Sequence, residues 1–368
     1  MKLKRIIIAG GGTGGHIFPA IAVAKALQRI NPAIEILFIG AKGKMEMEKV
    51  PQAGFKIEGL DITGFNRSSM WKNWSLPFKL IRSFVQVKNI FKDFKPDAVF
   101  GVGGYSSFPV LKYAQRKGIP SFLHESNSIA GKSNIILGKN ADLVMVANDE
   151  LKRYFPQEKI FISGNPIRHE IAHSTVLKEE AMDFFGLKKD KLTVLVVGGS
   201  LGAKSINSAI SMGIDKIVNA NLQLIWQTGK SSVNTIDESL WNKKEIFISE
   251  FINKMNYAYL AADIVISRAG AIAIAELCAM KKASVLVPFP FASEDHQTAN
   301  AMELVNNHAA MMVADKDVSE KLVDTVIQLV QDRLTCDRIS TAAGSMFIQD
   351  ADMLIANKII EKLELRND

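Results

Sequence analysis

The sequence predicts two α/β domains, each built on a parallel β-sheet with helices on both faces. Three observations lead to this expectation. The chain has 368 residues, whereas a single hydrophobic core stops growing at about 250–300 residues. Short β-branched runs alternate with amphipathic helical stretches, the order that produces parallel sheets. In each half, the first of these runs leads directly into a glycine-rich turn and then a helix, so the same architecture is expected twice.

Short apolar runs in both halves have the composition of buried parallel strands. In the first half they are residues 5–9, 34–39, 98–100, 121–123 and 143–146. In the second half they are residues 192–197, 222–226, 246–248, 263–266 and 284–287. The amphipathic stretches between them, such as residues 20–30, are expected to form the covering helices.

The domain boundary is expected near Pro166. The turn-forming sequence Ser163-Gly164-Asn165-Pro166 ends a strand, and a charged stretch over residues 169–190 precedes the next one. Residues 1–166 are therefore assigned to a first domain and residues 167–348 to a second. A closing amphipathic helix within residues 349–368 is expected to join the first domain. Its apolar positions recur at helical spacing and are Leu354, Ile355, Ile359, Ile360 and Leu363.

Composition narrows the possible locations and partners. The chain is 48% hydrophobic and 23% charged, with a net charge of +7, which favours an anionic partner such as a phosphorylated substrate or an acidic membrane surface. No arginine-rich tail or aromatic nucleic-acid motif is present, so nucleic acid is not expected. The apolar run at residues 6–9 is shorter than a signal peptide requires, and no run is long enough to span a membrane. Cys278 and Cys336 have no disulfide or metal-site spacing, so a cytoplasmic protein is expected.

The glycine-rich turns predict phosphate binding, because backbone N–H groups and a helix N-terminus attract anions. Residues 10–15 fit G-x-G-x-x-G, but a dinucleotide site also needs an acidic residue at the end of the second strand, where this chain has Lys42. Lys42 keeps an NADP-dependent oxidoreductase open as an alternative, and purely structural glycines are another. Similar turns occur at residues 101–106, 198–203 and 267–270. With two such turns in each half, the sequence favours a protein that binds two phosphorylated ligands.

One motif points to a different chemistry. His169-Glu170-Ile171-Ala172-His173 fits H-E-x-x-H, which on a helix places two imidazoles on one face for zinc. It follows the expected domain boundary, and no third ligand is evident. We interpret it as the solvated start of a helix.

A further set of motifs runs through the whole chain in a fixed order. They are Gly11-Gly12-Thr13-Gly14-Gly15-His16, Gly103-Gly104-Tyr105-Ser106, His124-Glu125 with Asn127, Gly164-Asn165-Pro166-Ile167-Arg168, Gly198-Gly199-Ser200-Leu201-Gly202-Ala203, Ser267-Arg268-Ala269-Gly270-Ala271, and His296-Gln297 with Asn300. With these motifs the chain resembles, over essentially its full length, the bacterial UDP-N-acetylglucosamine:undecaprenyl-pyrophosphoryl-muramoyl-pentapeptide N-acetylglucosaminyltransferases, the MurG-type enzymes of peptidoglycan synthesis.

The resemblance implies a GT-B glycosyltransferase fold, in which two Rossmann-like parallel-sheet domains are separated by a deep cleft. The C-terminal domain would hold UDP-N-acetylglucosamine and the N-terminal domain the lipid-linked muramoyl-pentapeptide acceptor. Transfer would invert the anomeric carbon without a metal or other cofactor. The enzyme would act as a peripheral protein at the cytoplasmic face of the inner membrane. Another GT-B transferase with a different UDP-sugar is the nearest alternative.

The resemblance also assigns site residues. On the donor side, Ser200 and Arg168 would face the diphosphate, the backbone at Ile252 the uracil, Glu276 the ribose, and Gln297 with Asn300 the sugar. Arg268, Ala271 and Ile272 complete the predicted donor site. On the acceptor side the expected residues are Thr13, Gly14, Gly15, His16, Tyr105, His124, Glu125 and Asn127.

Two positions depart from the family pattern. Ser126 stands where the family usually has glutamine. The helix after Gly270 usually carries a serine or threonine that can bind phosphate, and this chain has Ala273 in that helix. One expected contact with the diphosphate is therefore missing, although helix N–H groups can still bind it.

Direct displacement at the anomeric carbon needs a general base and stabilisation of the leaving diphosphate. His16 is one candidate base, because an imidazole titrates near neutral pH and this one follows a glycine turn. Glu125 is the other, and the sequence does not rank the two. Purely structural roles stay open as well. His16 could cap its helix, and His124 could donate a hydrogen bond to a neighbouring backbone carbonyl.

The stretch from Met70 to Phe94 predicts contact with an anionic membrane surface. Aromatic and aliphatic residues alternate with basic ones there, and no acid precedes Asp93, which is the pattern of interfacial segments. A core helix with one solvated basic face is the alternative, and part of the stripe is expected to be core. The residues concerned are Trp71, Lys72, Trp74, Leu76, Phe78, Lys79, Leu80, Ile81, Arg82, Phe84, Val85, Lys88, Ile90, Phe91 and Lys92.

Overall fold

A computed structural model describes residues 3–64, 71, 74 and 76–367. Contacts divide the chain into two compact units, the first made of Met1–Arg168 with Asp350–Asp368 and the second of His169–Gln349. Ile167 and Arg168, which the sequence analysis gave to the second domain, thus belong to the first unit. Each unit contains one parallel β-sheet, so the predicted pair of α/β domains is confirmed.

The first unit is built on seven strands in the order β3-β2-β1-β4-β5-β6-β7. All neighbouring strands are parallel. Sequence analysis located β1, β2, β4, β5 and β6, and it expected β7 only as the strand that ends at the turn beginning with Ser163. It missed β3, an edge strand whose Lys56 and Glu58 interrupt the apolar pattern. The strands are β1 (Arg5–Ala9), β2 (Glu35–Ala41), β3 (Lys56–Leu60), β4 (Ala98–Gly101), β5 (Ser121–Glu125), β6 (Leu143–Val146) and β7 (Ile160–Ile162).

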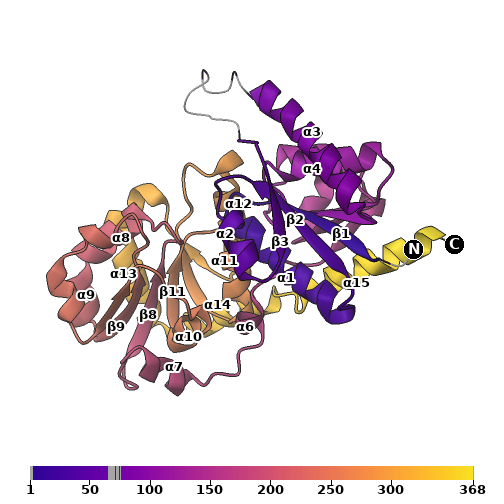
Figure 1. The fold of residues 1–368 in the computed structure, drawn as a ribbon. Helices are drawn as coiled ribbons and strands as arrows, with labels where there is room; N and C mark the ends of the chain where they lie inside the picture. Colours follow the sequence, from indigo (N-terminus) through magenta and orange to yellow (C-terminus); the bar gives the residue numbers. More distant parts are fainter. Residues whose placement is uncertain (1–2, 65–70, 72–73, 75, 368) are drawn as a thin grey trace. The chain divides into compact units, whose positions relative to one another are not determined.

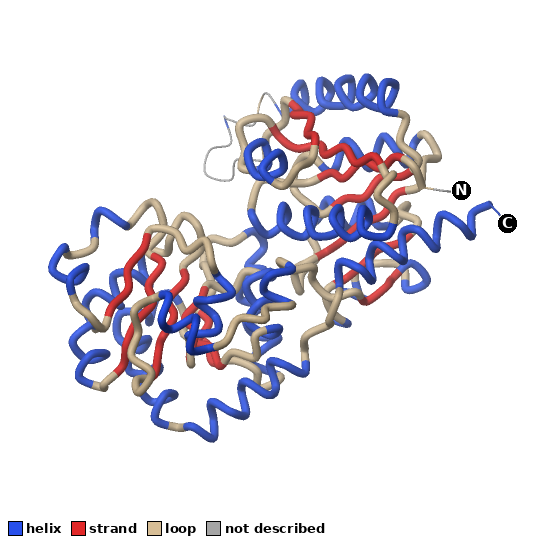
Figure 2. The backbone as a smooth tube through the Cα atoms, turned by 60° about the horizontal axis from the view of Figure 1, so that its bottom comes forward, coloured by secondary structure: helices blue, strands red, loops and turns tan. Residues whose placement is uncertain are grey.

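Helices cover both faces of this sheet (Figures 1 and 2). Successive residues of a strand point to opposite faces, so Ile6 and Ile8 pack in one apolar cluster with α1 and α15. Ile7 and Ala9 pack in a second cluster with α3 and α4. Figure 1 shows α15 lying beside α1, and the two helices are in contact. The helices are α1 (Gly14–Ile30), α2 (Glu46–Gln52), α3 (Leu76–Phe94), α4 (Ser107–Arg116), α5 (Lys132–Gly138) and α15 (Ala351–Glu364).

The second unit has six parallel strands in the order β10-β9-β8-β11-β12-β13. The strands are β8 (Leu192–Val197), β9 (Leu222–Gln227), β10 (Ile246–Ser249), β11 (Ile264–Ser267), β12 (Ala283–Leu286) and β13 (Met311–Met312). The two-residue β13 is too short to show periodicity, and sequence analysis missed it. The helices are α6 (His169–Ala172), α7 (Lys178–Phe184), α8 (Lys204–Met212), α9 (Ile214–Asn219), α10 (Met255–Ala261), α11 (Ala271–Ala279), α12 (His296–Asn306), α13 (Val318–Gln331) and α14 (Arg333–Ser345).

Each sheet has one point at which the strand order reverses. In the first unit it lies between β1 and β4, and in the second between β8 and β11. Open parallel sheets bind ligands outside the carboxyl ends of their strands at this point. The four predicted glycine turns follow these four strands, so the sheet order groups them into one pair in each unit.

Candidate active site

The glycine loop of the first unit is held by a buried carboxylate. Glu46, at the start of α2, is 1% exposed and accepts hydrogen bonds from Gly12 N and Ala41 N, both at 2.9 Å. A Cβ on Gly11 would lie 2.3 Å from this carboxyl group, so only glycine fits there. A side chain of the protein itself therefore occupies the Gly12 N–H group of this loop. Sequence reasoning missed Glu46; the available signal was an acid shortly after a strand that leads to the site.

His16 lies over the other loop at the same reversal point. Its Nδ1 is 3.2 Å from Gly11 O, and a carbonyl can only accept, so Nδ1 carries the proton of the neutral ring and Nε2 is the basic nitrogen. A Cβ on Gly103 would lie 2.9 Å from Nε2, which places the ring edge directly on the loop after β4. The backbone of this loop also touches the first, since a Cβ on Gly104 would meet Gly11 O at 2.4 Å.

The second candidate base, Glu125, is already saturated with donors. It lies at the end of β5 and is 3% exposed. Its Oε1 accepts hydrogen bonds from Asn127 N at 3.1 Å and Asn127 Nδ2 at 3.3 Å. Its Oε2 accepts from Gly131 N at 3.0 Å and Asn134 Nδ2 at 2.8 Å. This arrangement favours a role in shaping the loop that contains Asn127.

His124 is fully buried. Its Nε2 donates a hydrogen bond to Gly164 O at 3.1 Å, and Ser126 Oγ lies 3.5 Å from its Nδ1. The pKa of His124 is lowered to about 4, mainly by burial and also by the neighbouring His16, while the hydrogen bond to Gly164 opposes both effects. These contacts support the alternative that His124 satisfies a neighbouring carbonyl.

The other predicted acceptor residues lie on the same edge of the sheet. Thr13 is the N-cap residue of α1, which begins with Gly14 and Gly15, and its Oγ1 is 3.4 Å from His16 Nδ1. Tyr105 follows β4, is half exposed and packs its ring over Gly64.

Arg168, predicted for the donor diphosphate, places its guanidinium 5.7 Å from the centre of the Phe18 ring of α1.

In the second unit, backbone hydrogen bonds connect the predicted diphosphate loop after β8 to the loop after β9. Lys230 N and Ser231 N donate hydrogen bonds to Ser200 O and Leu201 O at 3.4 and 3.2 Å. A Cβ on Gly202 would lie 2.1 Å from Thr228 O, so the two backbones touch. Ser200 itself is exposed. The helix that follows, α8, has no side-chain cap at its N-terminus.

The backbone at Ile252, predicted to face uracil, is held by a side chain that sequence reasoning missed. Ile252 N donates a hydrogen bond to Gln227 Oε1 at 2.9 Å. Gln227 is the last residue of β9 and is 3% exposed. A polar residue at the end of an otherwise apolar strand was the available signal.

Arg268, predicted for the donor site, is engaged within the unit. Its Nη1 pairs with Asp315 at 2.6 Å and donates to Val287 O and Pro288 O at 3.2 Å. Its Nη2 donates to Ser205 Oγ at 2.9 Å. Ala271 and Ile272 begin α11, whose N-cap residue Gly270 supplies no side-chain cap. The N-terminus of α11 thus has no side-chain cap, whereas the guanidinium has four partners within the unit.

The predicted ribose and sugar residues lie on α11 and α12. Glu276 is 5% exposed and accepts a hydrogen bond from Tyr259 Oη at 3.1 Å. Asn300 Nδ2 donates to Ala269 O at 3.1 Å, and Gln297 Oε1 accepts from Phe289 N at 2.9 Å. Two successive residues just before α12, Glu294 and Asp295, have positive φ angles of 56° and 54°, a strained conformation that often marks functional sites.

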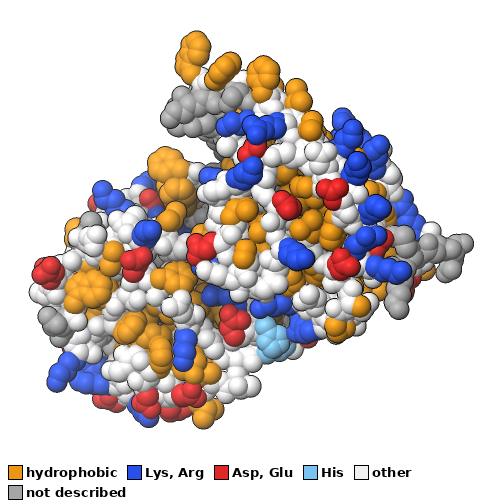
Figure 3. Space-filling model, in the orientation of Figure 1, with side chains coloured by type: hydrophobic (Ala, Val, Ile, Leu, Met, Phe, Trp, Pro, Cys, Tyr) orange, Lys and Arg blue, Asp and Glu red, His pale blue; other side chains and the backbone are white. Residues whose placement is uncertain are grey.

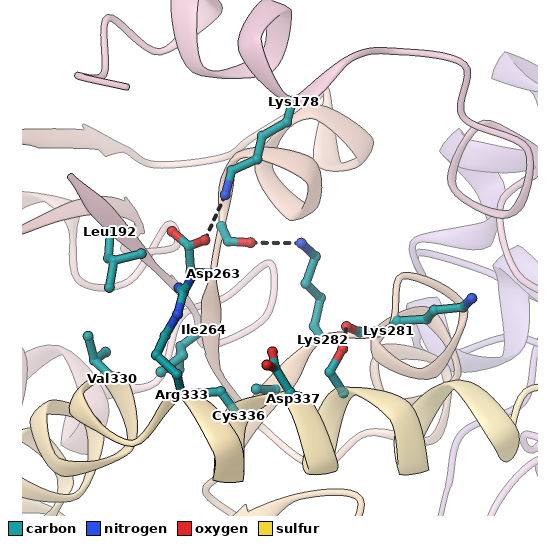
Figure 4. Close-up of a pocket in the computed structure, with 13 residues that line it drawn as sticks. Lys178, Leu192, Asp263, Ile264, Lys281, Lys282, Val330, Arg333, Cys336 and Asp337 are labelled. Carbon is teal, nitrogen blue, oxygen red and sulfur yellow. Dashed lines mark hydrogen bonds and ion pairs between the residues drawn. The ribbon is translucent and has the colours of Figure 1, made fainter. Parts of the chain in front are cut away.

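A cavity of about 250 Å³ lies at the opposite edge of the second sheet. Its lining includes Leu192, Ile264 and Ala283, which begin β8, β11 and β12. Figure 4 shows Lys178 paired with Asp263 and Lys282 directed to a backbone carbonyl, that of Ala262. Burial lowers the pKa of Lys282 to about 8. The cavity is at the amino ends of the strands, away from the predicted loops.

The first four residues of the H-E-x-x-H motif form the helix α6, and His173 follows it. His169 and His173 are both exposed, and their ring centres are 4.6 Å apart. Among the described residues, no group of three or more His, Cys, Asp or Glu side chains is arranged to hold a metal ion.

Family models match both units. The glycosyltransferase family 28 N-terminal domain matches residues 6–146, and the family 28 C-terminal domain matches residues 193–355.

Individual proteins match nearly the full length. The UDP-N-acetylglucosamine–N-acetylmuramyl-(pentapeptide) pyrophosphoryl-undecaprenol N-acetylglucosamine transferase of Phocaeicola vulgatus is 44% identical, covering 97% of this chain and 96% of the relative. The transferase of the same name from Bacteroides thetaiotaomicron is 43% identical over the whole of both chains. The crystal structure of Acinetobacter baumannii MurG has a TM-score of 0.77 at 28% identity, covering 98% of this chain and 99% of that one. The predicted GT-B fold class agrees with these neighbours.

Proposed function

Because this chain belongs to glycosyltransferase family 28, we propose that it transfers N-acetylglucosamine from UDP-N-acetylglucosamine to the muramoyl sugar of undecaprenyl-pyrophosphoryl-muramoyl-pentapeptide. The observation that carries the proposal is sequence identity of 42–47% to relatives named for this reaction. That identity extends over 90–100% of the chain, so it includes every predicted loop. The reaction forms the lipid-linked disaccharide of peptidoglycan synthesis.

The second unit is proposed to hold the donor. Its diphosphate would lie at the uncapped N-termini of α8 and α11, where N–H groups stabilise anions without a metal ion. Ser200 and the backbone at Ile252 would contact the diphosphate and the uracil. Glu276 would contact the ribose, and Gln297 and Asn300 the sugar.

The first unit is proposed to bind the acceptor and supply the base. The acceptor hydroxyl oxygen forms a bond to the anomeric carbon, and the bond from that carbon to the diphosphate breaks, with UDP leaving as an anion. His16 Nε2 takes the hydroxyl proton, since Nδ1 is engaged with Gly11 O. Glu125 is assigned the shaping of the acceptor loop, because its oxygens already accept four hydrogen bonds.

The Glu46 carboxylate argues against the oxidoreductase alternative. A dinucleotide binds its pyrophosphate at the N–H groups of the glycine loop. Gly12 N already donates to Glu46 at 2.9 Å, so this N–H group is not available to a dinucleotide pyrophosphate.

The experiment incubates the full chain with labelled UDP-N-acetylglucosamine and the lipid-linked muramoyl-pentapeptide. Label should move to the lipid fraction, and UDP-glucose and UDP-N-acetylgalactosamine serve as donor controls. A His16→Ala variant should lose most of kcat and keep its affinity for the donor. Label transfer from another UDP-sugar alone would support the alternative transferase, and a spectral change with NADPH would support the oxidoreductase.

The exposed face of α3 supports peripheral contact with an anionic membrane. Phe78, Ile81 and Val85 are 68, 64 and 55% exposed and recur at helical spacing on one face, which continues through exposed Lys88 and Lys92. Trp71 and Trp74 precede the helix and are 89 and 77% exposed. Figure 3 shows hydrophobic side chains projecting along this edge of the first unit. Met70 and Lys72 lie outside the described residues, and no described helix is long and apolar enough to cross a membrane.

We expect the protein to sediment with anionic phospholipid vesicles at low salt and to be released by salt. The double variant Phe78→Ser/Ile81→Ser should weaken binding at least about tenfold, because each side chain contributes roughly 1.5–3 kcal/mol when buried. A matched control is Leu177→Ser/Phe184→Ser, which removes two exposed apolar side chains of the second unit. Equal binding of both double variants would reject α3 as the membrane contact.

A further inference from the structure

One buried side chain joins two loops of the proposed donor site. Gln227 Oε1 accepts a hydrogen bond from Ile252 N at 2.9 Å, and its Nε2 donates one to Gly199 O at 3.2 Å. Ile252 belongs to the segment proposed to face uracil, and Gly199 to the loop proposed to face the diphosphate. A single amide thus connects the two ends of the predicted nucleotide site.

The backbones around Gln227 reinforce this connection. Thr228 N and Gly229 N donate to Ser249 O and Glu250 O, both at 3.0 Å, which extends the pairing of β9 and β10 into the loops. A Cβ on Gly229, whose φ is +77°, would lie 2.1 Å from Gly202 N. The loops after β8, β9 and β10 are therefore packed backbone against backbone, with the Gln227 side chain between the outer two.

We propose that Gln227 is a positioning residue that couples recognition of the uridine to recognition of the diphosphate. A buried amide that loses one partner costs more than the bond itself contributes, so Ile252 and Gly199 cannot shift independently. Binding of the base at Ile252 then fixes the loop that meets the diphosphate. The entropy lost in ordering the two loops is therefore lost once, and binding of the diphosphate does not require it again. Such coupling is reciprocal. The inference rests on the proposed function, since it assumes a uridine diphosphate donor.

The same strand contains a matched control. Gln223 is 1% exposed and lies near the opposite end of β9. Its Nε2 donates to Lys188 O, Lys191 O and Thr193 Oγ1 at 2.7, 3.1 and 3.0 Å, and its Oε1 accepts from Lys188 N at 2.9 Å. Gln223 is thus a second buried amide in the same strand, and its partners are not in the proposed donor site.

The test measures Kd for uridine and for UDP by calorimetry in the wild type, Gln227→Leu and Gln223→Leu. The ratio of the two constants gives the affinity gained from the diphosphate. In Gln227→Leu this gain should fall about tenfold, which corresponds to about 1.4 kcal/mol. Gln223→Leu should lose stability and retain the wild-type gain. An equal gain in all three proteins, or an equal loss in the two variants, overturns the proposal.

A measurement on the wild type covers the case in which Gln227→Leu fails to fold. Inorganic pyrophosphate should slow hydrogen exchange at the Ile252 amide, although the ion itself occupies only the diphosphate loop. Unchanged exchange at saturating pyrophosphate contradicts the coupling. A wild type that binds neither uridine nor UDP would instead reject the proposed donor site, so the two failures are distinguishable.

Discussion

Glu46, Glu125 and Gln227 each accept hydrogen bonds from backbone N–H groups of loops that contain predicted site residues. All three are at most 3% exposed. Glycine-rich loops cannot be stabilised by packing of their own side chains, because glycine has no side chain. Glycine also loses more conformational freedom on folding than any other residue. A buried polar side chain supplies the missing contacts, and losing such a partner costs about 1–3 kcal/mol. At this scale, precise placement of the site depends on residues outside the recognisable motifs.

His124 gives a residue-level prediction about pH. Its pKa is about 4 in the folded chain, against about 6.5 for an unperturbed histidine. As pH falls from 6.5 to 4, the unfolded chain takes up a proton that the folded chain does not, so the free energy of unfolding falls. The wild type should lose at most about 3 kcal/mol across this window relative to His124→Asn, as measured by urea unfolding. Parallel pH profiles for the two proteins would contradict the burial argument.

At the scale of elements, Arg268 links the end of β11 to three other segments of the second unit. Its partners come from the segment after β12, from Ser205 in α8 and from Asp315, which begins the 3-10 turn Asp315–Asp317. The ring of Phe289 lies 5.5 Å from the guanidinium carbon. A planar guanidinium with five donors suits such a junction. These contacts join the loop between β11 and α11 to the first turn of α8 through Ser205.

Replacing Arg268 by methionine should therefore lower stability more than donor affinity. The change removes the guanidinium from the partly buried Asp315 carboxylate, which keeps only its hydrogen bond from Ser205, and losing such a charged partner costs about 1–3 kcal/mol. Urea unfolding and UDP binding measure the two effects. A suitable control is Lys216→Met, whose pair with Asp324 is largely exposed and should contribute less than about 1 kcal/mol. Strong loss of UDP affinity with little loss of stability would instead support the predicted role of Arg268 in the donor site.

At the scale of the whole molecule, the chain leaves the first unit after Arg168 and returns to it at Asp350. The returning helix α15 buries Ile355, Ala356, Ile359 and Leu363 in the cluster that contains α1 and one face of the first sheet. The first unit therefore cannot complete its core until the second has been synthesised.

Truncating Ile359 tests this dependence. Ile359→Ala should cost about 2–5 kcal/mol in the unfolding of the first unit, because Ile359 is fully buried. UDP binding by the second unit should persist at denaturant concentrations that unfold the first. Leu354→Ala, on the same helix but 36% exposed, should change stability by less than about 0.5 kcal/mol. Simultaneous loss of both units in Ile359→Ala would show that they unfold as one.

Local patterns in the sequence were sufficient for most strands of both sheets, for the glycine turns and for the closing helix. Apolar runs, turn residues and helical spacing act between neighbours in the chain, so periodicity reveals them. The family motifs likewise located the loops that carry His16 and Ser200. Two edge strands were not predicted from the sequence, because β3 carries charged residues and β13 has only two residues.

Tertiary structure alone decided which residues support those loops. Glu46 and Gly12 are 34 residues apart, Gln227 and Gly199 are 28 apart, and Arg268 and Asp315 are 47 apart. The sequence left His16 and Glu125 unranked, and we propose His16 as the base because Glu125 accepts four hydrogen bonds from the chain. Such pairings depend on strand order and on the burial of polar atoms, which are set only when distant segments pack together and exclude water.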